Sequence, residues 1–151
     1  MLEHENVGFL IFCSVGLVPI ALGYGANPSV SMDALFDIKV ETINLTHILR
    51  AVMGLYLGMV VFWLWGAFNS SITRPALGAC AVFMLGLAAG RILSFILDGW
   101  PHWLLVVYAI LEIVFGWIAV ALTRNTKLRM PRRLCKPRGY RTGKTRKKRA
   151  S

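Results

Sequence analysis

Four long apolar stretches, separated by short polar breaks, dominate the sequence. A helix that crosses a membrane needs about 20 mainly apolar residues, because hydrocarbon offers its backbone no hydrogen-bond partners. One such stretch could be a buried helix of a soluble protein, but four leave too little polar surface for a water-soluble shell. We therefore predict an all-α fold, a four-helix transmembrane bundle with spans at about residues 7–25, 46–68, 75–97 and 101–122.

The first span has a second interpretation, as a cleaved signal peptide. Small residues at Ala21, Gly23 and Gly25 loosely fit a cleavage site, but the residues before the span include acids and no Lys or Arg. A signal peptide normally begins with a positively charged region, so we expect a retained helix.

Only the connection between the first and second spans, residues 26–45, is long. We expect it to lie on the bilayer surface, because it carries apolar side chains that suit an interfacial position: Met32, Leu35, Phe36, Ile38, Val40 and Ile43. The other connections are short polar turns around Asn69–Arg74 and Asp98–Gly99, so the last three spans should be antiparallel neighbours.

Basic residues are concentrated at one end of the chain. Thirteen of the 17 Lys and Arg residues lie between 123 and 151, whereas residues 1–122 carry four basic and seven acidic residues. This pattern excludes an ordinary soluble enzyme, and a nucleic-acid-binding domain would carry its basic face within the fold. We divide the chain into a membrane domain, residues 1–122, and a disordered basic tail, residues 123–151.

The charge distribution also predicts an orientation. Lys and Arg resist translocation, so the tail should be cytoplasmic, and four crossings put the N-terminus on the same side of a cell membrane. We expect the tail to contact membrane lipids through their anionic headgroups. A protein partner, a homo-oligomer or, less favoured, a nucleic acid is the alternative, since a basic arm also binds polyanions.

Two pairs of glycines predict a close helix contact. The second span carries Gly54 and Gly58, and the third carries Gly86 and Gly90. Small residues four apart let helices approach in lipid. With the 70–73 turn as the pivot, the two pairs fall at the same depth, so we expect them to face each other.

Three charged residues fall within the predicted spans: Arg50, Arg91 and Glu112. Charges inside a bilayer are costly and normally face a partner or a cavity. Helical side chains lean toward the N-terminus of their own helix, so Arg91 and Glu112, on antiparallel spans, converge. The first interpretation is therefore a structural Arg91–Glu112 ion pair, with Arg50 reaching the headgroups.

A second interpretation is a polar ligand site open to the outside. Its predicted members are Arg50, Arg91 and Glu112, with an edge formed by Tyr108, Ser94, Asp98, His47 and His102. Two positive charges and one negative charge would favour an anionic headgroup or a small acid. A proton relay through Glu112 is the third interpretation.

Catalytic signatures are absent from the sequence. It has no phosphate-binding loop, no nucleophile elbow and no His-Glu-x-x-His motif. His47, His102 and Asp98 could hold zinc, but their spacing is not typical of ligands, so we expect no metal and no cofactor. The cysteines Cys13, Cys80 and Cys135 are scattered and indicate no disulfide framework.

Two segments resemble the signatures of a bacterial family catalogued as domain of unknown function 4345. They are NLTHILRAVMGLYLG at 44–58 and GRILSFILDGWP at 90–101. Members are small four-pass membrane proteins, and the resemblance covers about residues 7–122. It implies that Arg50, Arg91, Asp98 and Glu112 belong to the family pattern, and it implies no activity. The long basic tail departs from the family.

Two classes of function remain open. The first is a non-enzymatic membrane component that acts through interaction or lipid contact, as the missing catalytic motifs and the basic tail indicate. The second is a small-ligand binder or transporter with an outward-facing polar site around Arg91 and Glu112.

Overall fold

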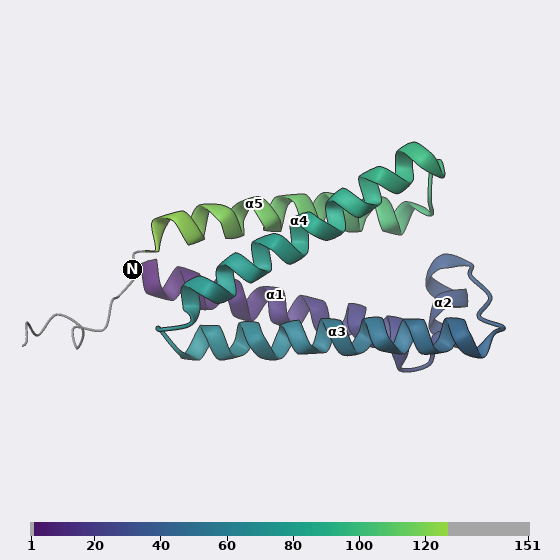
Figure 1. Cartoon of the computed structure of the whole chain (residues 1–151), viewed down its shortest axis with the longest axis horizontal. Helices are drawn as coiled ribbons and strands as arrows, with labels where there is room; N and C mark the ends of the chain where they lie inside the picture. The colour runs from purple at the N-terminus through teal and green to yellow at the C-terminus, as the bar shows by residue number, and fades with distance from the viewer. Residues whose placement is uncertain (1, 127–151) are drawn as a thin grey trace, which may run out of the picture.

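The computed structural model describes residues 2–126, and this part of the chain contains five helices and no strands. Four are long and apolar enough to cross a membrane: α1 (Leu2–Gly25), α3 (Ile43–Phe68), α4 (Thr73–Leu97) and α5 (Trp103–Asn125). The predicted four-helix bundle is therefore confirmed (Figure 1). The basic tail is predicted to begin at residue 123, but α5 continues to Asn125. The rest of the predicted tail, residues 127–151, lies outside the described range.

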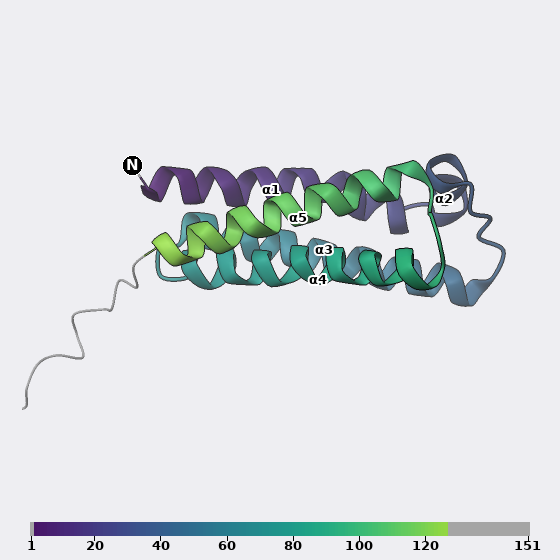
Figure 2. The same cartoon turned by 90° about the horizontal axis from the view of Figure 1, so that it is seen from above.

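The long helices pack as two antiparallel pairs. α1 packs against α3, and α4 packs against α5. Figures 1 and 2 show the bundle from two sides, and in Figure 1 α4 crosses α5 at an angle. Near the start of α1, the Nδ2 of Asn6 donates a hydrogen bond of 3.0 Å to Oγ1 of Thr126, directly after α5. The two ends of the described chain consequently lie at the same end of the bundle.

A tight turn joins α3 to α4. The Thr73 hydroxyl lies 2.8 Å from the Gly66 carbonyl oxygen, a group that the end of α3 leaves without a helical partner. A Cβ added to Gly66 would collide with the Cβ of Ala76. Glycine is therefore required where the two helices leave the turn side by side.

The predicted contact between Gly54–Gly58 and Gly86–Gly90 is wrong. A Cβ at any of these four glycines would meet no atom within 4 Å. The face of α3 that meets α4 carries Tyr56 and Trp63, whose rings pack edge-on against Phe83 at centroid distances of 5.2 and 5.6 Å. Each α3 glycine lies two residues from Tyr56, a rotation of about 200° on a helix, and therefore turns away from α4.

A short helix, α2 (Pro28–Phe36), occupies part of the long connection. Pro28 suits its first turn, where the missing N–H has no helical acceptor to lose. The helix ends where Asp37 adopts a left-handed backbone conformation, with a φ of 56°.

The interfacial prediction for this connection is only partly right. Met32 and Phe36 are buried against the bundle, with exposed fractions of 2% and 7%. The ring of Phe36 stacks on the ring of Tyr24 of α1, with centroids 6.2 Å apart. The buried face of α2 therefore packs against one end of the bundle and is not available to the bilayer surface. Leu35, Ile38 and Ile43 do stay exposed.

Apolar residues fill the bundle and also cover it. The buried side chains come mainly from α1, α3 and α4, and include Leu10, Leu17, Ala21, Val60, Trp63, Leu77, Cys80 and Met84. Large apolar side chains are also exposed along the helices, including Val15, Val61, Val82, Ile96 and Trp117. An apolar exterior on all four long helices is what a lipid environment requires.

Candidate functional site

The hairpin of α4 and α5 brings together the two charged side chains that lie deepest in the predicted spans. Arg91 lies two turns before the end of α4, and Glu112 lies near the middle of α5. Because the two helices are antiparallel, the tilt of each side chain toward its own N-terminus directs the pair toward each other. The predicted Arg91–Glu112 ion pair is confirmed.

The ion pair has a specific geometry. The Nε of Arg91 lies 3.0 Å from Oε1 and 2.9 Å from Oε2 of Glu112, so one N–H is shared between both carboxylate oxygens. The side chains are 17% and 10% exposed. The Tyr108 ring, one turn before Glu112 on α5, lies 5.7 Å from the guanidinium carbon of Arg91. This distance is typical of a cation–π contact.

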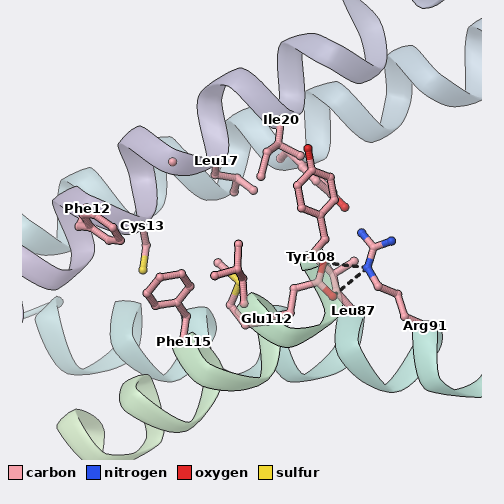
Figure 3. A pocket seen from close by; sticks show the side chains of 13 residues that line it. Phe12, Cys13, Leu17, Ile20, Leu87, Arg91, Tyr108, Glu112 and Phe115 are labelled. Carbon is pink, nitrogen blue, oxygen red and sulfur yellow. Dashed lines mark hydrogen bonds and ion pairs between the residues drawn. The ribbon is translucent and has the colours of Figure 1, made fainter. Parts of the chain in front are cut away.

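A pocket of about 280 Å³ adjoins the ion pair. Its walls come from α1, α4 and α5, with Tyr56 contributed by α3. Figure 3 shows Phe12, Cys13 and Phe115 at one end and Arg91 at the other. Apart from Arg91, Glu112 and the tyrosine hydroxyls, the lining is almost entirely apolar.

The pocket opens between α1 and α5. Three of its lining residues, Phe12 and Gly16 on α1 and Leu111 on α5, are exposed on the surface of the bundle. Phe12 and Phe115 contact each other across the two helices, with ring centroids 5.6 Å apart. Since these positions lie well inside the two spans, the opening faces the side of the bundle that hydrocarbon would cover.

The structure separates the predicted site residues into groups. Arg91, Glu112 and Tyr108 line the pocket together. Ser94 and Asp98 instead line a neighbouring groove beside the α4–α5 loop, which Arg91 also borders.

The remaining predicted residues lie apart from the pocket. His102 caps α5, because its Nδ1 accepts a hydrogen bond of 3.4 Å from the Leu104 N–H, and its ring contacts Phe36 edge-on. His47 and Arg50 are exposed on α3 and line neither the pocket nor the groove. Among residues 2–126, no three His, Cys, Asp or Glu side chains come together as metal ligands would.

The position of Arg50 changes the electrostatics of the site. The sequence-based expectation of a net positive centre requires both arginines. With Arg50 outside, Arg91 and Glu112 are the charged side chains that line the pocket, and their formal charges cancel. An anionic ligand is therefore no longer favoured by charge alone.

The sequence did not indicate the α1 wall or Tyr56. Leu10, Cys13, Leu17 and Ala21 recur at helical spacing and are all buried, so a periodic signal exists. Both faces of α1 are apolar, however, and polarity does not distinguish the face that meets protein from the face that meets lipid.

These features define a class of protein: a multi-pass α-helical membrane protein with an ion pair and a pocket among its spans. The family described as Domain of unknown function (DUF4345) matches residues 7–123, and the chain belongs to this family. No curated protein and no solved structure matches the chain.

Replacing Glu112 tests the structural role of the ion pair. Glu112→Gln leaves the Arg91 charge without its partner in an apolar setting, which should cost about 3 kcal/mol of stability. Arg50→Gln removes an exposed charge and should change stability by no more than about 0.5 kcal/mol. Thermal unfolding of both variants in detergent measures the difference, and equal melting temperatures would contradict a stabilising pair.

Proposed function

We propose that this protein is a non-enzymatic membrane component that contacts lipid by holding part of one lipid molecule in the pocket between α1, α4 and α5. The observation that carries the proposal is an apolar pocket, lined by residues of all four spans, that opens through Phe12, Gly16 and Leu111 toward the surrounding hydrocarbon.

The size of the pocket supports partial entry of a lipid. Its volume of about 280 Å³ is at the lower limit of ligand pockets, which run from about 300 to 1,000 Å³. A whole membrane lipid is too large for this space. One chain segment or one ring fits, while the rest of the molecule stays in the bilayer through the opening.

The state of Glu112 supports a binding role over a catalytic one. A general base needs a carboxylate that can reach the proton it removes. Both carboxylate oxygens of Glu112 already accept from Arg91. The two charged groups at the pocket are thus engaged with each other.

A substitution that fills the pocket tests lipid binding. Gly16 lines the pocket, and a Cβ added there meets no atom within 4 Å. We therefore expect Gly16→Phe to occupy the opening without displacing the helix backbones. Gly8→Phe is the matched control, because Gly8 has the same open surroundings on the same helix but does not line the pocket. We expect native mass spectrometry to find a tightly retained lipid on the wild type and on Gly8→Phe, and much less on Gly16→Phe. Equal retention by all three proteins would contradict the proposal.

We further propose that the protein resides in the cell membrane with both termini in the cytoplasm. Support comes from the concentration of Lys and Arg after residue 122 and from the hydrogen bond between Asn6 and Thr126, which joins the two ends of the bundle domain on one side.

Labelling with a membrane-impermeant maleimide tests this orientation. Cys135 lies in the basic tail, whereas Cys13 and Cys80 are buried and should not react. Asp98→Cys adds an exposed thiol at the end of α4. In intact cells we expect Asp98→Cys to be labelled at the new thiol and Cys135 to react only after permeabilisation. Labelling of Cys135 in intact cells would show the reverse orientation.

A further inference from the structure

Arg91 has hydrogen-bonding capacity that the ion pair does not use. A guanidinium carries five N–H donors, and only the one on Nε is bonded to Glu112. Figure 3 shows the two terminal nitrogens on the side away from the carboxylate, near the Tyr108 ring. Tyr24 is also a side-chain hydrogen-bond partner of the guanidinium. One tyrosine hydroxyl cannot engage all the terminal N–H groups, so within residues 2–126 Arg91 keeps donors that no other group accepts from.

The surroundings of these donors are aromatic. Tyr108 lies beside the guanidinium, and its ring is 6.4 Å from that of Phe36. Tyr56 also lines the pocket, with Tyr24 at a ring distance of 5.7 Å. These aromatic rings limit the access of water to the Arg91 guanidinium. A hydrogen bond from a charged donor is stronger where water is excluded.

Charge balance selects the kind of acceptor. Arg91 and Glu112 together are neutral, and no other charged side chain lines the pocket. An anionic headgroup would give this buried site a net negative charge, which is costly in an apolar medium. An uncharged oxygen acceptor bonds to the free N–H groups of Arg91 and leaves the net charge of the site at zero.

We infer that the Arg91 end of the pocket is a headgroup subsite for an uncharged lipid that carries a carbonyl oxygen. The terminal N–H groups of Arg91 donate to the carbonyl, Glu112 holds the guanidinium in place through Nε, and the attached chain follows the apolar lining toward Phe12 and Phe115. The ring of an isoprenoid quinone and the ester of a glycerolipid share this chemistry. The inference rests on the proposed lipid-binding function and adds the class of the ligand.

Three probes that share the same alkyl chain length and differ in their head groups test the subsite. Hexadecane, methyl hexadecanoate and hexadecanoate are added to the purified full-length protein in nanodiscs, and binding is compared after correction for partition into the bilayer. We expect the ester to bind about tenfold more tightly than hexadecane, a difference of about 1.4 kcal/mol, and also more tightly than the carboxylate. A quinone with a decyl chain and a diacylglycerol then compete with the bound ester, and displacement by either one identifies the source of the carbonyl.

Three other results of these binding experiments would each contradict one claim: the subsite, the ligand class or the proposed function. Saturable binding of ester and hexadecane with equal affinity overturns the subsite and leaves the lipid pocket intact. Tightest binding of hexadecanoate, or displacement of the ester by neither competitor, overturns the uncharged carbonyl ligand. Binding of no probe, together with unchanged lipid retention in Gly16→Phe, overturns the proposed function itself.

Two variants assign the head-group preference to Arg91. The double variant Arg91→Met with Glu112→Met removes the pair without leaving a buried charge, a replacement that proteins often tolerate. It should bind ester and hexadecane equally, whereas Arg50→Met, which changes a charge outside the pocket, should keep the tenfold preference. Persistence of the preference in the double variant overturns the role of Arg91.

Discussion

A charge inside a membrane-spanning helix needs a partner, and this requirement organises the α4–α5 hairpin. Arg91 and Glu112 meet through one shared N–H, with Tyr108 against the guanidinium. Removing either charge alone leaves the other in an apolar setting, so the pair fixes how the two helices align. The same pair forms the polar end of the pocket, and the structural and the proposed binding roles therefore depend on one contact.

Shape, rather than polarity, decides the other helix contacts. The core and the exterior of the bundle are both apolar, so burial from water does not distinguish one face of a helix from another. The rings of Tyr56, Trp63 and Phe83 fill the space between α3 and α4. Glycine is used where helices approach most closely, because a Cβ would strike Ala76 at Gly66, Met53 at Gly25 and Leu85 at Gly116. The pocket lies where α1 meets the α4–α5 pair.

The sequence was informative wherever a strong physical rule applied. Span length and hydropathy predicted the four long helices, and the direction of helical side chains predicted that Arg91 and Glu112 would meet. The glycine pattern gave a wrong prediction at Gly54, Gly58, Gly86 and Gly90. Glycines four apart indicate a face that a helix can contact, but they do not indicate which helix, if any, occupies that face. Arg50 and His47 share a depth range with Arg91 but lie on a helix that pairs with α1, and depth alone could not reveal this. The α2 helix buried Met32 and Phe36 because their side chains fill the end of the bundle, an outcome that depends on tertiary packing.

A double-mutant cycle of Arg91→Met and Glu112→Met, followed by unfolding in detergent, tests the central contact most directly. If the two side chains stabilise each other, each single variant should lose about 3 kcal/mol, and the double variant should be more stable than either single one. Additive losses would contradict the account, because they would mean that the two charges act independently of each other.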